Sequence, residues 1–219
     1  MLDWNAIRTV LLDMDGTLLD LHFDNHFWLE HVPLRYAQKH DMDVERAKQE
    51  LFPKFKQHEG TIDWYCLDFW TSELDLDIAL LKEEVDHLIA VHPYVIQFLD
   101  AVRTPERRVL LVTNAHFKSL TLKMQRTQLS GHFDRLVTAH DFKIPKENIK
   151  FWDALREVEN FECDSTLLID DSLSVLRSAQ AYGIKHLLAV YKPDSKSPQR
   201  DVGEFQALQG FDQIMPESN

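Results

Sequence analysis

Five short, continuous apolar runs constrain the fold of this chain more than any other feature. They span residues 9–14, 108–113, 136–139, 166–169 and 186–191. Apolar runs without polar alternation are typical of strands that are covered on both faces, as in a parallel sheet. Segments with helical periodicity lie between the later runs, at about 93–103, 117–129, 147–160 and 172–182. This alternation predicts an α/β fold with a doubly wound parallel sheet.

A long insertion separates the first two runs. Residues 21–90 contain no convincing strand, and their apolar residues recur at helical spacing around 27–40, 44–58 and 64–90. We therefore predict an inserted α-helical lobe over 21–90 and a core made of 1–20 and 91–219. The lobe holds ten of the 23 aromatic residues of the chain. After the last apolar run we expect a surface loop over 193–203 and a short final helix.

The composition disfavours several classes of function. The formal net charge is −12, whereas a protein that binds nucleic-acid polymers through their phosphates needs a basic face. No run approaches the roughly 20 apolar residues of a membrane span, and the acidic first residues do not resemble a signal peptide. Cys66 and Cys163 lie far apart in no CxxC spacing. We therefore expect a cytoplasmic protein with reduced thiols. The sequence does not determine its oligomeric state.

Two aspartates end the first predicted strand, in the sequence Asp13-Met14-Asp15-Gly16-Thr17. Because side chains alternate along a strand, Asp13 and Asp15 point the same way. Converging carboxylates repel each other unless a cation or a shared proton relieves them, and Mg²⁺ prefers such hard oxygen ligands. A plain surface turn is the alternative interpretation, since Asp and Gly are common in turns.

Polar residues also follow three later strands. Thr113 and Asn114 end the second run, Lys146 follows the third, and Asp170 and Asp171 end the fourth. The carboxyl ends of strands form the ligand crevice of open α/β sheets, and hydroxyl, amide and N–H groups at a helix start can cradle a phosphate. Each feature alone could be a helix cap or a solvated loop residue. Together, in strand order, they predict one site for a metal ion and a phosphate group.

This ordered set resembles the four-motif pattern of the haloacid dehalogenase (HAD) superfamily of phosphohydrolases. The resemblance spans nearly the whole chain and sets the predicted helical lobe in the place of that superfamily's C1-type cap. It implies a Rossmann-like core and a Mg²⁺-dependent phosphatase that hydrolyses a phosphate monoester through an aspartyl-phosphate intermediate.

The resemblance also implies a role for each catalytic residue. Asp13 would attack phosphorus, and Asp15 would protonate the leaving oxygen and then activate water. Thr113 would hydrogen-bond the phosphoryl oxygens, with Asn114 beside it in the phosphate site. Lys146 would steady Asp13 and the phosphoryl charge.

The implied metal site uses two side chains and one main-chain oxygen. Mg²⁺ would be bound by the carboxylates of Asp13 and Asp170 and by the carbonyl of Asp15. Asp171 would lie behind these ligands or bind the ion through water.

Two positions depart from the usual pattern of the superfamily. Many relatives have Lys-Pro where this chain has Pro145-Lys146, and Lys143 lies three residues upstream, so we favour Lys146 over Lys143 as the motif lysine. Many relatives also have Ser after the aspartate that corresponds to Asp20, whereas Leu21 follows here. The second departure concerns the start of the cap.

The cap sequence resembles one subgroup in particular. Segments 23–28 (FDNHFW), 64–70 (WYCLDFW) and 113–116 (TNAH) are similar to those of bacterial purine 5′-mononucleotidases that act on GMP and IMP. Aromatic rings above the phosphate site could stack a purine base, although rings at helical spacing more often form the core of a lobe. His116 could reach the substrate, or be structural. The implied partner is a small nucleoside monophosphate.

Alternatives stay open at this point. A phosphatase of small sugar or acid phosphates, such as phosphoglycolate, would use the same residues, as would a phosphomutase. Haloacid dehalogenation is disfavoured because that chemistry does without the second acid, Asp15. A non-enzymatic metal-binding module is disfavoured because it needs neither Asp15 nor Lys146.

Overall fold

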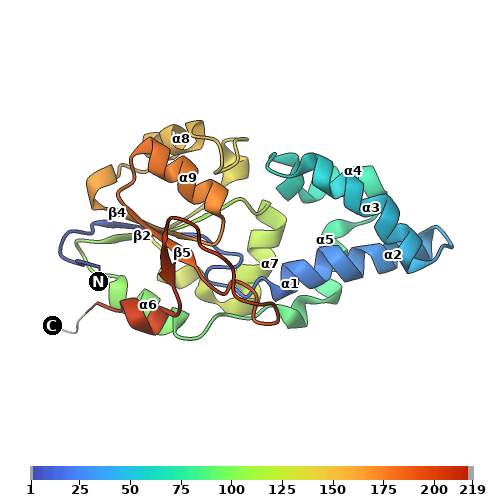
Figure 1. Ribbon diagram of the computed structural model, residues 1–219, viewed down its shortest axis with the longest axis horizontal. Coiled ribbons are helices and arrows are strands. Elements are labelled where there is room, and N and C mark those ends of the chain that lie inside the picture. The colour runs from blue at the N-terminus through green and yellow to red at the C-terminus, as the bar shows by residue number, and fades with distance from the viewer. Residues whose placement is uncertain (1, 217–219) are drawn as a thin grey trace.

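Six parallel strands form one sheet at the centre of the larger part of the molecule (Figure 1). The computed structural model describes residues 2–216. The strand order is β3-β2-β1-β4-β5-β6. Their bounds are β1 Thr9–Leu12, β2 Arg108–Thr113, β3 Arg135–Thr138, β4 Thr166–Asp170, β5 His186–Val190 and β6 Gln206–Leu208. The predicted parallel sheet is confirmed, with β1 in its interior.

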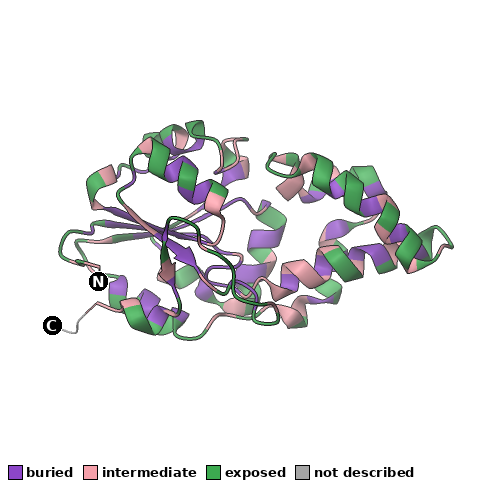
Figure 2. Cartoon of the chain, viewed as in Figure 1, coloured by how far each residue is buried: buried purple, intermediate pink, exposed green. Residues whose placement is uncertain are grey.

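Helices cover both faces of this sheet, as the prediction of a doubly wound fold requires. α6 (Val95–Val102) and α7 (Phe117–Thr127) pack on one face, and α8 (Lys150–Val158) and α9 (Leu173–Tyr182) pack on the other (Figure 1). Side chains of β1 alternate between the two apolar clusters: Leu12 packs with α6 and α7, and Leu11 packs with α8 and α9. The central strands β1, β2 and β4 are accordingly buried almost throughout (Figure 2).

The inserted segment folds into a helical lobe at the end of the molecule opposite both termini (Figure 1). Its helices are α1 His22–His26, the π-helix η1 Phe27–His31, α2 Val32–Lys39, α3 Val44–His58, α4 Leu67–Leu74 and α5 Ile78–Glu84. Short 3₁₀ turns complete the fold: η2 Asp63–Tyr65, η3 Asp86–Leu88, η4 Leu129–His132, η5 Ala139–Asp141, η6 Cys163–Ser165 and η7 Phe211–Ile214. Phe23, Phe27 and Trp70 are buried in the core of the lobe, which we call the cap.

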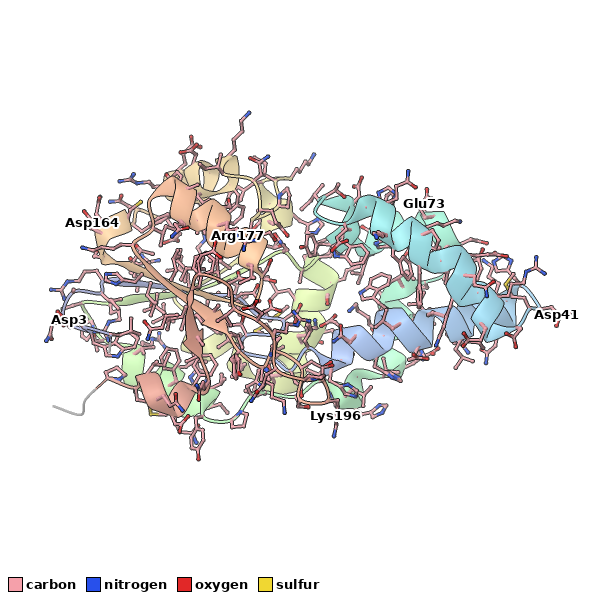
Figure 3. All side chains as sticks on the ribbon, in the orientation of Figure 1. Asp3, Asp41, Glu73, Asp164, Arg177 and Lys196 are labelled. Atoms are coloured by element: carbon pink, nitrogen blue, oxygen red, sulfur yellow. The ribbon has the colours of Figure 1, made fainter. Side chains whose placement is uncertain are left out.

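The chain crosses between core and cap twice, and the two crossings lie side by side. Leu19 and Val91 form an isolated antiparallel bridge, and the Asp20 N–H donates to the carbonyl of Ala90 at 2.9 Å. A loop after β5 contacts α1, because Asn25 Nδ2 donates to Asp194 at 2.7 Å. Figure 3 labels Lys196 on this loop, next to α1.

The end of the chain differs from the sequence-based expectation. Residues 206–208 form the edge strand β6, with Leu208 beside Val190 of β5, and the 3₁₀ turn η7 takes the place of the expected final helix. Leu208 and Phe211 are buried in the core. A strand of three residues leaves too short a pattern to separate from a loop. Within 2–216 no helix has the length and apolarity needed to cross a membrane.

Candidate active site

The register of the sheet brings the predicted acidic residues together. Leu12 of β1 pairs with Ile169 of β4, so Asp13 and Asp170 come next on neighbouring strands. The turn after Asp13 depends on Gly16, which has φ +80°. A Cβ at this position would lie 2.6 Å from the Asp171 carboxylate, so only glycine fits between this turn and Asp171.

Lys146 lies at the centre of this site. Its Nζ donates to Asp13 Oδ1 at 2.5 Å, to Asp170 Oδ2 at 2.7 Å and to the Val112 carbonyl at 3.0 Å. The lysine is 1% exposed. Lys143, the other candidate for the motif lysine, is exposed. Of the two lysines, only Lys146 reaches the strand ends.

The carboxyl groups of the site are strongly perturbed. Burial raises the pKa of Asp13 to about 6, with Lys146 opposing the shift and Asp170 adding to it. Burial also raises the pKa of Asp170 against the pull of Lys146. The pKa of Asp171 lies well above its usual value because of burial and repulsion from Asp13 and Asp170. Three crowded acids with raised pKa values, of which Asp13 and Asp170 are buried and Asp171 is half-buried, indicate a place where a further cation would be stabilised.

The geometry of these acids fits a hard divalent cation. One oxygen from each of Asp13, Asp170 and Asp171 lies within 4.8 Å of the others. All three are oxygen donors at the edge of a cavity, as Mg²⁺ prefers. Asp171, expected behind the ligands or bound through water, also has an oxygen within this limit. Arg200 Nη1 lies 3.3 Å from Asp171 Oδ2.

Asp15 belongs to a second cluster, which joins the core to the cap. Lys123 Nζ of α7 donates to Asp15 Oδ1 at 2.6 Å and to Asp24 Oδ2 at 2.7 Å. Lys82 Nζ of α5 donates to Asp24 Oδ1 at 2.8 Å and lies over the rings of the cap core. Asp24 belongs to α1, three residues after Leu21, where the sequence departs from the usual superfamily pattern. An unbroken chain of ion pairs therefore runs from Asp15 into the cap.

The charges of this second cluster shift two acids in opposite directions. Burial and the charge of Asp24 together raise the pKa of Asp15 to about 6, against the opposing charge of Lys123. Burial would also raise the pKa of Asp24, but Lys123 and Lys82 outweigh it and hold that pKa at about 2. Asp24 is therefore ionised at neutral pH, while Asp15 is poised to exchange a proton.

Thr113 and Asn114 end β2 as predicted, but their side chains differ in availability. Thr113 Oγ1 accepts from the Ala115 N–H at 3.0 Å, which leaves its own proton free to donate. The amide of Asn114 is used twice within the protein: Oδ1 accepts from the Lys146 N–H at 2.9 Å, and Nδ2 donates to Glu147 at 2.9 Å. Asn114 thus positions the loop of Lys146, and its side chain is less free for a phosphate than we expected.

A cavity of about 520 Å³ lies between the strand ends and the cap. Asp13, Asp15, Thr113, Lys146 and Asp170 line its core side. Its cap side is lined by the aromatic residues Trp28, Phe52, Phe55, Trp64 and Tyr65. The rings of Trp28 and Trp64 stack with centroids 6.5 Å apart. Phe55 belongs to the buried core of the cap as well as to the cavity wall, and Trp28 and Trp64 pack against that core.

Sequence reasoning missed Lys123, Asp24 and Glu147. Glu147 accepts from Tyr65 Oη at 2.6 Å as well as from Asn114, and so gives a second link between cap and core. One signal was available for Lys123: it lies on the apolar face of α7 with Leu120 and Met124. A lysine among buried positions of a helix usually has a carboxylate partner.

The chain belongs to the haloacid dehalogenase-like hydrolases, and its fold is that of the family. The family matches residues 7–183. The resemblance inferred from the motifs is therefore confirmed.

Two curated relatives cover almost the whole chain. The GMP/IMP nucleotidases YrfG of Escherichia coli and Shigella flexneri are each 36% identical over 213 residues, which cover 97% of this chain and 96% of theirs. Among solved structures, a HAD phosphatase from Thermococcus onnurineus is similar with a TM-score of 0.79 at 22% identity. That match covers 95% of this chain and 96% of the other.

Proposed function

We propose that this hydrolase is a Mg²⁺-dependent phosphatase of purine 5′-mononucleotides, GMP and IMP above all, with Asp13 as nucleophile. The observation that carries the proposal is the cavity itself. Its core side presents Asp13, Lys146 and Asp170 to a phosphate. Its cap side presents aromatic rings to the leaving group of the phosphate ester.

The acidic cluster would bind the metal ion. Mg²⁺ would be held by the carboxylates of Asp13 and Asp170 and by the main-chain carbonyl of Asp15, with Asp171 beside them. When bound, the ion would neutralise phosphoryl charge and orient the phosphate toward Asp13. Lys146 supplies a second positive charge on the same side, because it contacts both Asp13 and Asp170.

The side chains of the protein carry out the reaction in two steps. The Asp13 carboxylate forms a bond to phosphorus as the ester P–O bond breaks, and Asp15 gives its proton to the leaving oxygen. Water then attacks the aspartyl phosphate, Asp15 takes a proton from it, and the bond from Asp13 to phosphorus breaks. The free hydroxyl proton of Thr113 donates to the phosphoryl oxygens during both steps.

The cap side of the cavity supports a nucleotide over a smaller phosphate ester. Five aromatic residues line it, and its volume lies within the range of sites that enclose drug-sized ligands. The 36% identity to GMP/IMP nucleotidases extends over nearly the full chain, cap included. A small acid phosphate such as phosphoglycolate would leave these rings without a contact.

A substrate panel tests the choice of substrate. We expect kcat/KM in Mg²⁺ to be higher for GMP and IMP than for p-nitrophenyl phosphate or phosphoglycolate. In Phe52→Ala, kcat/KM for IMP should fall about 5- to 50-fold through lost stacking, while that for phosphoglycolate should hold. Phe52 is suited to this test because it is 38% exposed, so its truncation disturbs little packing. Equal or reversed preference in the wild type would favour the small-ester alternative.

Metal removal tests the cofactor. Dialysis against EDTA should abolish turnover, and added Mg²⁺ should restore it. Full activity in EDTA, measured after the metal content has been shown to be negligible, would contradict the metal role of Asp13 and Asp170.

A further inference from the structure

A second group of side chains of types that can bind a metal lies where the cap meets the core; it is separate from the carboxylate cluster, although His116 also lines the catalytic cavity. Cys66 precedes α4 in the cap, His116 precedes α7, and His140 lies in η5. One ligand atom from each residue lies within 4.8 Å of the other two. Three residues from three separate elements thus converge on one point.

Two ring nitrogens of this group lack the hydrogen bonds that buried polar atoms normally have. Nδ1 of His116 and Nε2 of His140 are buried and have no partner among the described residues. His116 is only 3% exposed. Leaving a buried acceptor unsatisfied costs about 1–3 kcal/mol. A ligand bound by both nitrogens would remove that cost.

The surroundings of the two imidazoles suit metal binding. The second ring nitrogen of His116, Nε2, lies 3.6 Å from Asp68 Oδ2, and histidines that bind metals commonly present their other nitrogen to a carboxylate. Burial lowers the pKa of His116 to about 4, and burial also lowers the pKa of His140. Both rings therefore keep a lone pair at neutral pH.

We propose that Cys66 Sγ, His116 Nδ1 and His140 Nε2 bind a transition-metal ion of the zinc type, which joins the cap to the core. Thiolate and imidazole ligands select Zn²⁺ over Mg²⁺, which requires oxygen. Tetrahedral zinc with bonds of about 2.0–2.3 Å sets its ligand atoms roughly 3.3–3.7 Å apart. Because their ligand atoms lie within 4.8 Å of one another, the three side chains would need to approach by at most about 1.5 Å, and a fourth position stays open to water.

Cobalt binding tests the proposal directly, because Co²⁺ takes the place of Zn²⁺ and absorbs light. The full chain is titrated with Co²⁺ in excess Mg²⁺, which occupies the oxygen site. We expect one equivalent to give visible tetrahedral bands and a near-ultraviolet thiolate-to-cobalt band, and Zn²⁺ to abolish both. Competition with a chromophoric chelator then gives the Zn²⁺ affinity.

Matched variants identify the ligands. Cys66→Ser keeps an N-cap for α4 and should remove the thiolate band and weaken Zn²⁺ binding at least tenfold. His140→Ala should weaken it similarly. Cys163→Ser, at the other free cysteine, should bind like the wild type, and circular dichroism checks the fold of each variant. Absence of the thiolate band in the wild type, or its persistence in Cys66→Ser, would overturn the proposal.

Discussion

Lys146 and Lys123 are both buried and each lies between two carboxylates, but only one of the two clusters lies wholly within the core. Lys146 contacts Asp13 and Asp170 at the ends of β1 and β4. Lys123 contacts Asp15 in the core and Asp24 in the cap. Asp13, the proposed nucleophile, is therefore held by groups of the core alone, whereas Asp15, the proposed acid–base group, is held partly by the cap.

This difference assigns separate tasks to the two clusters. The Lys146 cluster has both of its carboxylates in the core and meets the cap only indirectly, through Glu147 and Tyr65, so its geometry should depend less on where the cap lies. A cluster that spans core and cap is complete only when the cap is in the position seen here. We therefore expect proton transfer by Asp15 to depend on cap position more than nucleophilic attack by Asp13 does.

The largest effect should come from the nucleophile. Asp13→Asn keeps the size of the side chain but removes the attacking oxygen anion, so kcat should fall by roughly 10⁴-fold or more. Steady-state kinetics with IMP measures the loss, and circular dichroism checks that the fold is kept. A variant with near wild-type kcat would remove Asp13 from the chemistry.

Removal of the core lysine should reduce both activity and stability. Lys146→Met leaves Asp13 and Asp170 buried without their cation, which should cost about 3–5 kcal/mol of unfolding free energy in metal-free buffer and roughly 10²–10³-fold in kcat. Urea denaturation and kinetics measure the two losses. Lys143→Met, at the exposed neighbour, is the matched control and should change neither.

Removal of the lysine that joins core and cap should alter the pH profile. Lys123 lowers the pKa of Asp15, so in Lys123→Met that pKa should rise above about 6. Asp15 then keeps its proton to higher pH, and the alkaline limb of kcat/KM moves upward, while kcat falls about 10- to 100-fold. Lys82 contacts Asp24 but not Asp15, so Lys82→Met should shift the alkaline limb of kcat/KM less. An equal shift in both variants would contradict a direct role for Lys123.

Removal of the charge on Asp24, the cap residue of this cluster, should have the smallest effect of these substitutions. The folded-state pKa of Asp24 is about 2, below its usual value of 3.8. The ionised carboxylate therefore stabilises the fold fully at pH values above about 3.8, and this stabilisation is lost as the pH falls toward 2. Asp24→Asn should therefore lower the unfolding free energy by about 2 kcal/mol at pH 7. The deficit should shrink as the pH falls from 5 to 3. Chemical denaturation across this range measures it, and a constant deficit would argue against the ion pairs.

The residues of this site that could be predicted from the sequence are those placed by the ends of the strands. Asp13, Thr113 and Asp170 end strands whose apolar runs are visible in the sequence, and parallel register then forces these ends together. Lys146 follows β3 by the same logic. The fold class, α/β with a doubly wound sheet, follows from the same runs.

The rest depends on how the cap lies against the core. The pairing of Lys123 with Asp24, like the meeting of Cys66 with His116 and His140, joins residues from separate elements without a local motif. Asn114 was expected at the phosphate, but its amide is taken up by Lys146 and Glu147. Such contacts are set by tertiary packing, which spacing along one chain does not encode.

Trapping of the phosphoenzyme tests the central claim most directly. Asp15→Asn should still accept a phosphoryl group on Asp13 from ³²P-labelled IMP but hydrolyse it slowly, so acid quenching should recover label on the protein that hydroxylamine releases. The double variant with Asp13→Asn should carry no label. Label that survives in the double variant, or label on Asp15→Asn that hydroxylamine does not release, would contradict the assignment of Asp13 as nucleophile.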